Sequence, residues 1–522
     1  MAQDAEQATD CVPVLVVGAG PVGLTAAYEL ARRGVAVRLV DAAAGPATTS
    51  RALATHARTL EIYDQLGVLP ELVGRGQRVE NFTLHQNGRT LTRFETDYSK
   101  LPTRYPFTLM VDQVITEEVL RTAAARLGVH VEWGVRLAEF DQDEHGVHAV
   151  LEHADGRTDR VDAGWLVGCD GGHSTVRKRL GLQLIGDSTE TWLLADAVVD
   201  TDLPRGSIHW MRTKTGTVML VPFPDPGKWR LLDTTGAATD LGDEAVAARF
   251  TEMISNGIGR PVTVRRPSWV SVFTIQQRMI PQMRSGRCFV AGDAAHVHSP
   301  ASGQGMNTGV QDAYNLAWKL AMVVHGQAGQ QLLDTYSEER VPVGRKLLDS
   351  TKVATYLVQL KNPVVAGLLP VIFGMVNVLT PLKRRIQAKI MGGMSGLALG
   401  YGESPLSKTD SPGTVVLPGE RVSRVDGAGV RDPEWAMLVE RLRGTAWTLL
   451  AVGSAPENRW GDWVSVYPVE GGGRLARDVA AAPGSWLLIR PDGYLAARGS
   501  TADELDSALA AVHPTRSGAA LS

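Results

Sequence analysis

Cysteine is scarce in this 522-residue chain, and the three present, Cys11, Cys169 and Cys288, include no Cys-x-x-Cys pair. Each lies in an apolar run typical of a buried strand. Such usage indicates inert thiols in a reducing compartment, so we expect a cytoplasmic protein. We assign it no disulfide framework, no thiol redox centre and no metal site.

Strong net charge is also absent. The 53 lysines and arginines nearly balance the 56 aspartates and glutamates, which gives a formal charge of −3. A chain of this balance carries no basic footprint for nucleic acid or for an anionic membrane surface. We therefore expect a small-molecule partner, and neither nucleic acid nor a membrane.

A long unbroken hydrophobic run is missing as well. The N-terminal stretch MAQDAEQATD has neither the basic region nor the apolar core of a secretory signal. The apolar stretch PVVAGLLPVIFGMVNVLTPL at residues 363–382 is interrupted by prolines and glycines. Packed, broken helices are expected there rather than a membrane span.

The length implies two or three domains, because a single core stops growing at roughly 250–300 residues. Residues 1–185 begin with strand VPVLVVGAG, helix GLTAAYELARRG and strand VAVRLVD. That order predicts a βαβ unit and an α/β fold. The same style returns over residues 281–400, where helices follow.

Between these two parts, residues 186–280 carry the short strand patterns GSIHWMR, TVMLVPF and KWRLLDT, separated by turn residues. They predict an antiparallel sheet inserted into the α/β domain. A Gly/Pro/Ser-rich passage at 401–413 is typical of a linker. It opens a separate block, residues 401–522, made of strands and a final helix that Thr501 is expected to cap.

A Gly-x-Gly-x-x-Gly motif joins the first strand to the first helix. It contains Gly18, Gly20, Pro21 and Gly23, and Asp41 ends the next strand. Glycines permit a tight turn that brings N–H groups onto a pyrophosphate at a helix N-terminus, and the Asp41 carboxylate can accept from ribose hydroxyls. An adenine dinucleotide is therefore predicted, either NAD or FAD.

A second glycine-rich junction follows at residues 287–321, RCFVAGDAAHVHSPASGQGMNTGVQDAYNLAWKLA. A buried strand stops at Gly292 and Asp293, and a helix begins after a loop. An NAD-dependent dehydrogenase needs no second junction, whereas FAD is long enough to need one for its ribityl chain and flavin ring. Asp293 can bond ribityl hydroxyls, and the amides of residues 303–307 can face the flavin edge. The junction therefore favours FAD.

Three ordered motifs carry a family resemblance: GAGPVGL, CDGGHSTVR at 169–177, and GDAAHVHSPASGQGMNTGVQDAYNLAWKLA. The chain resembles the FAD-dependent aromatic hydroxylases, the single-component group A flavoprotein monooxygenases, and is most similar to those acting on aromatic polyketides. The resemblance extends over nearly the whole chain. It implies a Rossmann-like FAD-binding domain in two parts, 1–185 and 281–400, a substrate-binding β-sheet at 186–280, and a thioredoxin-like domain at 401–522 that lacks Cys-x-x-Cys.

The resemblance also places the cofactors. Asp41 stands where the family more often has Glu. Arg177 is a candidate NADPH contact, with a surface arginine beside a turn as the alternative. His296 is expected to be a structural hydrogen-bonding residue rather than a catalyst. The chain has no second dinucleotide fold, so NADPH is expected to visit transiently. The FAD contacts that the resemblance implies are Gly18, Gly20, Pro21, Gly23, Asp41, Arg51, Gln113, Asp170, Gly292, Asp293, Pro300, Gly303, Gly305, Met306 and Asn307.

The implied activity is hydroxylation of a phenolic or polycyclic aromatic substrate. By resemblance, NADPH reduces FAD, O₂ adds to form a flavin hydroperoxide, and its distal oxygen passes to an electron-rich ring carbon. The site has to hold the ring there and exclude water. Large apolar residues alternate along the inserted strands and are candidates for the substrate pocket, with core packing as the alternative: Trp210, Met219, Val221, Phe223, Trp229 and Leu231.

No catalytic residue is assigned. His209 or the Arg51 region could assist phenol ionisation, but the sequence shows no Ser/His/Asp or paired-carboxylate arrangement. A Baeyer–Villiger oxygenase or epoxidase of the same fold stays open, as does a non-catalytic flavoprotein that binds a ligand. A flavin-dependent halogenase is disfavoured because W-x-W-x-I-P is absent. The C-terminal block is expected to act as a scaffold or dimer contact, which leaves a homodimer open.

Overall fold

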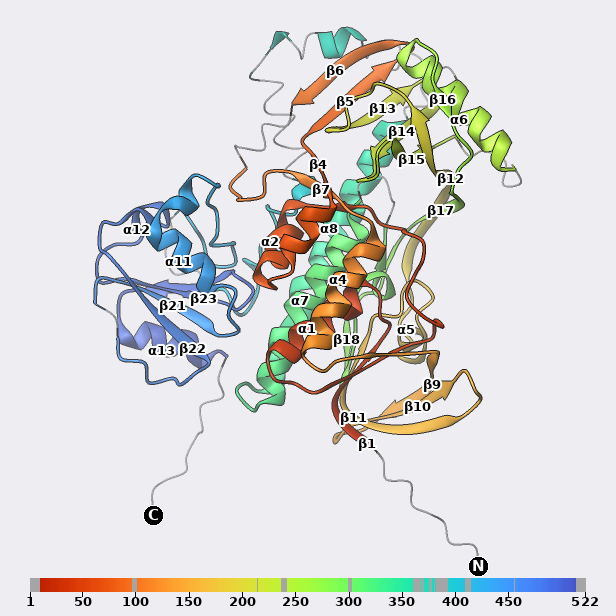
Figure 1. Cartoon of the computed structure of the whole chain (residues 1–522). Helices are drawn as coiled ribbons and strands as arrows, with labels where there is room; N and C mark the ends of the chain where they lie inside the picture. Colours follow the sequence, from red (N-terminus) through yellow and green to blue (C-terminus); the bar gives the residue numbers. More distant parts are fainter. Residues whose placement is uncertain are drawn as a thin grey trace, which may run out of the picture.

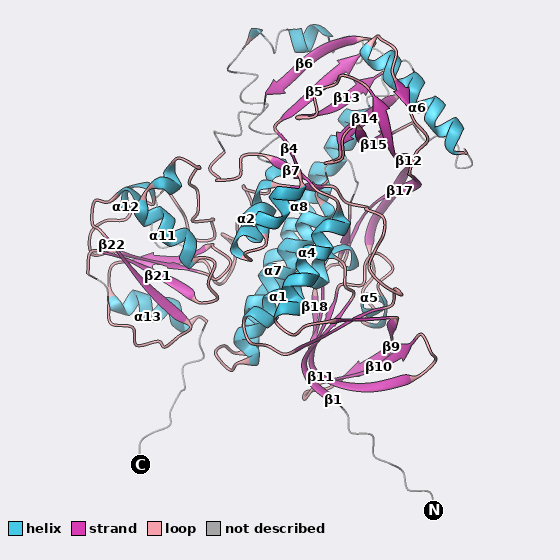
Figure 2. Cartoon of the chain, viewed as in Figure 1, coloured by secondary structure: helices cyan, strands magenta, loops and turns pink. Residues whose placement is uncertain are grey.

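The computed structural model of the chain describes residues 10–95, 101–213, 215–235, 242–298, 303–359, 368, 370–374, 378–379, 381, 393–408, 415–454 and 456–512. Pro300 and most of the apolar stretch at 363–382 lie outside these residues. The described chain forms three regions: a central α/β region, an antiparallel sheet at one end of it, and a C-terminal block at its side (Figures 1 and 2).

The central region is built on a mainly parallel sheet. Its strands run in the order β18 (Arg284–Ser285), β19 (Cys288–Val290), β11 (Thr158–Gly168), β1 (Asp10–Val17), β2 (Val37–Asp41) and β8 (Val131–Trp133). Strand β11 pairs in parallel with both β1 and β19, and Val17, Gly168 and Val290 share one register. The residues that follow these three therefore emerge side by side, which brings the two glycine-rich junctions to one edge.

Helices α1 (Pro21–Arg32), α4 (Gln113–Arg126), α7 (Gly305–Val324) and α8 (Asp334–Gln359) stand together in the middle of the molecule (Figure 1). Apolar residues of α1 and α7, such as Leu24, Leu30 and Leu320, share one core with the strands of the parallel sheet. This burial fixes α7, whose first turn holds the second glycine-rich junction. The predicted α/β fold and the first βαβ unit are confirmed.

Smaller elements complete this region. Strands β9 (Val135–Gln142) and β10 (Val147–His153) extend the sheet as a hairpin, because β10 pairs antiparallel with β11. Helices α2 (Ala57–Gln65) and α3 (Leu69–Arg75) follow the loop after β2, and α5 (Thr175–Arg179) follows β11. A small sheet joins β3 (Ala54–Thr55), β7 (Thr108–Met110) and β4 (Gln77–Val79).

The second large sheet is mostly antiparallel. It contains, in order, β20 (His296–Val297), β17 (Trp269–Met279), β12 (Ile185–Asp200), β15 (Lys228–Asp233), β14 (Thr217–Pro222), β13 (Ser207–Arg212), β5 (Asn81–Gln86) and β6 (Arg89–Glu95), with β16 (Thr263–Val264) paired to β12. The three strands predicted from the sequence, β13, β14 and β15, are confirmed.

This sheet reaches beyond the predicted segment 186–280. Strands β5 and β6 come from the first part of the chain, and β5 pairs in parallel with β13. The turn between them contains Asn87 and Gly88, which both have positive φ. Asn-Gly between alternating apolar residues is a strong hairpin signal, so these strands were recognisable in the sequence. Their pairing with β13 is a long-range contact that no local pattern encodes.

The two faces of the antiparallel sheet have different covers. Helix α6 (Asp243–Ile258) packs on one face, where Phe250 and Val246 share a core with Trp229 and Leu231. The other face, which includes Trp210, packs with residues of the central region such as Leu53 and Met110. Only this second face is directed toward the glycine-rich junctions.

The C-terminal block contains a four-stranded sheet, β22 (Val464–Val469), β21 (Trp447–Val452), β23 (Trp486–Ile489) and β24 (Leu495–Gly499), with helices α11 (Pro433–Arg441), α12 (Arg474–Asp478) and α13 (Ala502–Ala510). Thr501 caps α13 in a reciprocal capping box with Glu504, as predicted. One face of the sheet packs on α7, where the rings of Trp318 and Trp447 meet edge to face at 5.6 Å.

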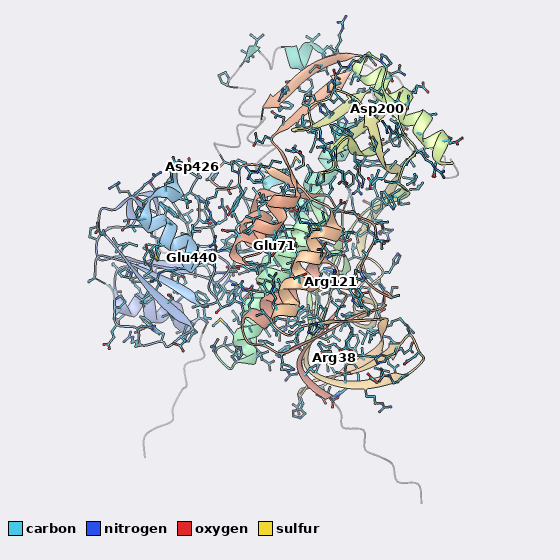
Figure 3. The ribbon with its side chains drawn as sticks, viewed as in Figure 1. Arg38, Glu71, Arg121, Asp200, Asp426 and Glu440 are labelled. Atoms are coloured by element: carbon cyan, nitrogen blue, oxygen red, sulfur yellow. The ribbon has the colours of Figure 1, made fainter. Side chains whose placement is uncertain are left out.

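Charged side chains lie on the outside of all three regions. Glu71, Asp200, Asp426 and Glu440 are exposed on α3, β12, a C-terminal loop and α11 (Figure 3). Within the described part of the chain, no helix is both long enough and apolar enough to cross a membrane.

Because the two faces of the antiparallel sheet have separate cores, we expect that a substitution in the core beneath α6 leaves the cofactor site intact. Phe250→Ala removes a fully buried ring on the inner side of α6 and should lower the free energy of unfolding by about 3–5 kcal/mol. The dissociation constant for FAD should stay unchanged. Denaturant unfolding and flavin titration measure the two effects, with the exposed Glu252→Ala on the same helix as the control.

Candidate functional site

At the first glycine-rich junction, the main chain of Gly18 lies close to that of Cys169, and the main chain of Gly23 lies close to that of Gly18. Gly18 has φ +100°, and a Cβ there would lie 2.4 Å from the Cys169 carbonyl oxygen. A Cβ on Gly23 would lie 1.8 Å from the Gly18 carbonyl oxygen. Neither glycine can be replaced without moving the backbone, so both are required by the turn itself.

Gly20 is different, because a Cβ built on it would meet no atom within 4 Å. It is the N-cap of α1, and Pro21 occupies the first turn of that helix. The first N–H groups of a helix have no partner within the helix, and they carry its positive end. Open space in front of such groups is the arrangement that a pyrophosphate needs.

Asp41 closes this junction. Its carboxylate accepts hydrogen bonds from the N–H of Ala19 at 2.6 Å and of Ala43 at 2.8 Å. The side chain thereby fixes the glycine-rich turn and stays partly exposed at its rim. This position is compatible with the predicted ribose contact.

At the second junction, the buried carboxylate of Asp312 on α7 ties three elements together. It accepts from the N–H of Gly292 at 3.1 Å, bonds His296 Nε2 at 2.6 Å and pairs with Arg340 Nε of α8 at 2.7 Å. Burial opposes ionisation, but His296 and Arg340 hold the pKa of Asp312 down at about 2. The carboxylate is therefore charged, and His296 has the structural part expected of it.

Asp293 follows Gly292 directly and lies beside this network. The residue is exposed, although protein surrounds it closely enough to raise the pKa of its carboxyl, an effect that His296 and Arg51 oppose. A Cβ on Gly305 would stand 3.9 Å from Asp293 Oδ1. The carboxylate therefore faces the start of α7.

Asn307 pins the first turn of α7 to the central region. Its side-chain NH₂ donates to the carbonyls of Ala54 and Gly303, both at 2.8 Å, and its Oδ1 accepts from the N–H of His56 at 2.8 Å. Gly303 has φ +61°, and Met306 packs against the central core. These bonds hold the Gly303–Asn307 main chain in place.

The loop that carries Arg51 is held from two sides. Gln113 accepts from the N–H of Ala52 at 2.9 Å, and Arg230 on β15 donates to the carbonyls of Ser50 and Arg51 at 2.7 and 2.6 Å. Arg230 also forms two bonds with Asp196, both at 2.8 Å. The Arg51 side chain itself is exposed. Gln113 thus supports the loop through the bond that it accepts from Ala52.

Arg230 and Asp312 were not identified from the sequence. Each is an ionisable residue in a predicted strand or helix that also carries apolar residues, KWRLLD and GVQDAYNLA. A buried charge is retained only when it is paired, so that pattern was an available signal for a structural ion pair. The identity of the partner could not be read from it.

In the middle motif, at 169–177, the side chains of Asp170 and Arg177 form most of their hydrogen bonds with other residues of the same motif. Asp170 accepts from Ser174 Oγ at 2.5 Å and from the N–H groups of Thr175 and Val176 at the start of α5. Arg177 donates to the carbonyls of Gly172 and Ala294, at 2.9 and 3.1 Å, and is only 6% exposed. Arg177 therefore links this motif to the second glycine-rich junction.

The six substrate candidates are divided between the two faces of the antiparallel sheet. Trp210, Met219, Val221 and Phe223 lie on the face toward the central region. Trp229 and Leu231 lie on the other face, beneath α6, because side chains alternate along β15. These last two belong to the core beneath α6, so core packing, the alternative given for these candidates, applies to them, and only the other four stay candidates for the substrate pocket.

His209 also lies on the outer face. It is buried between His85, whose Nε2 lies 3.1 Å from its Nδ1, and the Pro204 carbonyl, and its ring meets Trp229 edge to face. Burial lowers the pKa of His209 to about 4. A role for His209 as a base that touches substrate is therefore excluded by its position.

The described residues include no group of three or more His, Cys, Asp or Glu side chains that could hold a metal ion. They do bring the two glycine-rich junctions to one edge of the parallel sheet. The first junction has bare N–H groups at α1, and the second has a carboxylate and main chain at α7. A two-part ligand with a pyrophosphate in its middle fits this arrangement, as FAD does.

Known proteins match the chain strongly. The family model described as an FAD binding domain matches residues 11–351. The 6-methylpretetramide 4-monooxygenase of Streptomyces rimosus is 54% identical over 520 residues, which are 96% of this chain and 93% of that protein. The chain belongs to the FAD-dependent aromatic hydroxylases.

Solved structures of such hydroxylases share the whole architecture. The anhydrotetracycline hydroxylase OxyS of Streptomyces rimosus has a TM-score of 0.76 and 29% identity, with 96% of this chain and 99% of that chain covered. The flavin-dependent monooxygenase PieE, in complex with FAD and substrate, has a TM-score of 0.78 and 25% identity at the same coverage. The mixed α/β fold, the FAD cofactor and the monooxygenase class are confirmed for this hydroxylase.

The open space in front of Gly20 predicts a selective loss of cofactor. Gly20→Val places methyl groups where the pyrophosphate should lie, while its extended backbone tolerates the side chain, so the hydroxylase should fold with an unchanged melting temperature in the absence of FAD. Its FAD affinity should fall at least about 100-fold, which is roughly 2.7 kcal/mol.

Gly206→Val is the matched control, since a Cβ at Gly206 also meets nothing within 4 Å and this turn lies in the antiparallel sheet. Quenching of flavin fluorescence measures both variants. FAD binding by Gly20→Val at wild-type affinity would contradict the assignment of the pyrophosphate site.

Proposed function

We propose that this hydroxylase adds one hydroxyl group to a polycyclic phenol of the polyketide class, with NADPH and O₂ as co-substrates. One observation carries the proposal: the 54% identity to 6-methylpretetramide 4-monooxygenase extends over 96% of the chain, including the antiparallel sheet and the C-terminal block. A relative that shared only the cofactor fold would match only the central region. We therefore propose a substrate of the size and ring type of a pretetramide.

The inner face of the antiparallel sheet is the proposed substrate wall. Trp210, Met219 and Val221 keep 6–8% of their surface exposed, whereas Leu220 and Leu231 on the outer face keep none. These three residues are the part of the inner face that we propose contacts the substrate next to the central region. Apolar walls hold an aromatic ring and keep water out, which the reaction requires.

The cofactor supplies the redox and oxygen-transfer chemistry when it is bound. The chain holds it through the main chain of both junctions, and through the sheet it also holds the Arg51 loop, because Arg230 bridges β15 to that loop. One residue thereby links the substrate wall to the cofactor site. The pair Arg230–Asp196 fixes the distance between ring and cofactor, a condition for efficient transfer.

A cavity of about 620 Å³ opens beside the first turns of α7. His56, Gln304 and Asn307 line it, together with residues of α8 and of segments 393–404 and 417–420. It is large enough for a polycyclic ligand. None of the six substrate candidates lines it, so we assign the ring to the sheet side.

For Arg177 we propose a supporting part in NADPH handling. Its guanidinium is buried and occupied by two carbonyls, so it would shape the loop of Gly172 rather than grip the nucleotide. We also propose that the C-terminal block is thioredoxin-like, since its sheet combines a parallel pair, β21 and β22, with two antiparallel strands. It holds none of the three cysteines, which supports a scaffold or dimer contact in a cytoplasmic enzyme.

The proposal is tested by supplying the purified, FAD-loaded protein with polycyclic phenols, NADPH and ¹⁸O₂. Stimulated NADPH oxidation and a product that carries one ¹⁸O atom as a ring hydroxyl are expected. A ring-expanded lactone or an epoxide would instead indicate the alternative oxygenases. NADPH-independent binding with no added oxygen from any phenol would indicate a ligand-binding flavoprotein.

Neighbouring residues on opposite faces of β14 give a sharp test of the substrate wall. Met219→Ala should raise the KM for the phenol several-fold and divert more NADPH to hydrogen peroxide, because the inner wall loses volume. Leu220→Ala, on the outer face, should lower the melting temperature yet leave KM and peroxide yield unchanged. Steady-state kinetics and a peroxide assay distinguish them. Equal effects of the two variants on KM would contradict this assignment of faces.

A further inference from the structure

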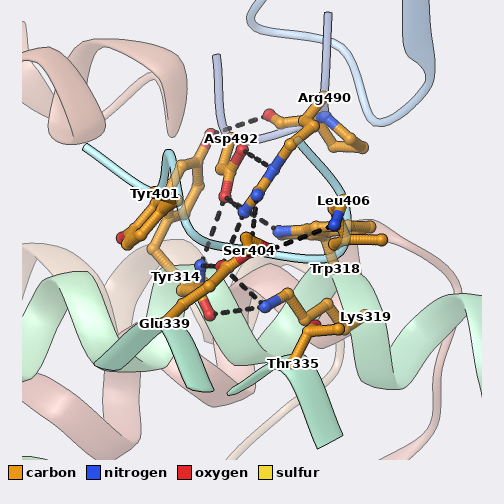
Figure 4. Close-up of polar contacts among 12 residues, drawn as sticks. Tyr314, Trp318, Lys319, Thr335, Glu339, Tyr401, Ser404, Leu406, Arg490 and Asp492 are labelled. Atoms are coloured by element: carbon orange, nitrogen blue, oxygen red, sulfur yellow. Dashed lines mark hydrogen bonds and ion pairs between the residues drawn. The ribbon is translucent and has the colours of Figure 1, made fainter. Parts of the chain in front are cut away.

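A fully buried ionic network joins the C-terminal block to the central region (Figure 4). Arg490, which follows β23, donates to both carboxylate oxygens of Glu339 on α8, at 2.6 and 2.9 Å. It also donates to both oxygens of Asp492, at 3.0 and 2.6 Å. All three side chains are at most 2% exposed.

Glu339 is the hub of this network. The same carboxylate accepts from Lys319 Nζ at 2.8 Å, from Asn315 Nδ2 at 2.7 Å and from Ser404 Oγ at 2.6 Å. Two cations, Arg490 and Lys319, thus balance the two anions, Glu339 and Asp492. Burial raises the pKa of Glu339, but Arg490 and Lys319 outweigh that effect and bring it well below the ordinary value. The carboxylate therefore stays ionised in the interior.

The network continues to the cofactor edge through adjacent residues of α8. Glu339 bonds the C-terminal block, and the next residue, Arg340, pairs with Asp312 at 2.7 Å. Asp312 accepts from the N–H of Gly292, two residues after the end of β19. Helix α7 is bonded to both Glu339 and Arg340 of α8. Asp312 pairs with Arg340, and Asn315 and Lys319, one and two turns later, bond Glu339.

A second connection runs through α2. Arg58 donates to the Asp492 carbonyl at 2.8 Å. Just before α2, the N–H of His56 bonds Asn307 in the first turn of α7. The turn around Arg490–Asp492 therefore contacts α8 through Glu339 and α2 through Arg58, and both of these helices are bonded to the second glycine-rich junction.

We propose that Arg490 is a positioning residue for FAD: the C-terminal block, through Arg490 and Glu339, fixes the α7–α8 pair so that Gly292, Asp293 and the first turn of α7 match the flavin. Buried charges are stable only while every partner is in place, so this network favours a single arrangement of the two helices. The inference rests on FAD binding and not on the proposed substrate.

The first test compares FAD affinities. Arg490→Gln should raise the dissociation constant for FAD about tenfold, the scale at which substitutions in packed networks change binding at another site. Arg490→Lys keeps the charge and should recover much of the affinity. If Arg490→Gln yields no folded protein, Asp492→Asn, which weakens the same turn, takes its place. Flavin fluorescence titration measures all three variants.

The matched control is Leu438→Ala, which leaves a cavity under α11 on the far face of the same sheet. It should lower the melting temperature as Arg490→Gln does, yet leave FAD affinity unchanged. If the two variants weaken FAD equally at equal loss of melting temperature, Arg490 has only a structural role and the proposal fails.

The wild-type protein offers an independent test, because coupling between two sites is reciprocal. Addition of FAD should slow amide hydrogen exchange at residues 490–494 and leave exchange in α12 unaffected. No slowing at 490–494 under saturating FAD would overturn the proposal. Loss of hydroxylase activity does not enter either measurement, so a wrong substrate assignment leaves both readouts intact.

Discussion

One buried carboxylate holds the cofactor edge of this protein together. Asp312 bonds Gly292 after the end of β19, the imidazole of His296 and the guanidinium of Arg340, and all of these groups are shielded from water. An ionised carboxylate in the interior is stable only while these partners surround it. The position of strand end, loop and helix relative to one another therefore depends on this one set of bonds.

The same principle explains how distant regions reach the site. Arg230 crosses from the antiparallel sheet to the carbonyls of the Arg51 loop, and Arg490 crosses from the C-terminal block to Glu339. Both are arginines whose forked guanidinium satisfies two partners at once. The antiparallel sheet and the C-terminal block are thereby each tied by an arginine to the region that carries the two glycine-rich junctions.

The elements that depend on local sequence patterns could be predicted from the sequence. Both glycine-rich junctions, the βαβ unit and the strands β13 to β15 follow from periodicity and turn residues, and the structure has them where predicted. The three glycines of the first motif could not be ranked in advance. Gly18 and Gly23 are needed by backbone contacts with Cys169 and within the turn, and Gly20 alone faces open space.

What could not be predicted are contacts between segments far apart in the chain. Trp229 and Trp210 are equally apolar in the sequence, yet the alternation along paired strands puts them on opposite faces of the sheet. The pairing of β5 with β13 and the partners of Arg230 and Arg490 also depend on the assembled fold. Local patterns specify a buried charge but not its partner.

The central claim is that a single FAD spans both glycine-rich junctions, and competitive binding of its two halves tests it most directly. Calorimetric titration of flavin-free protein should show AMP and FMN each binding far more weakly than FAD, with each half displaced when FAD is added. AMP binding as tightly as FAD, together with no detectable site for FMN, would contradict the account, because the second junction would then contribute nothing.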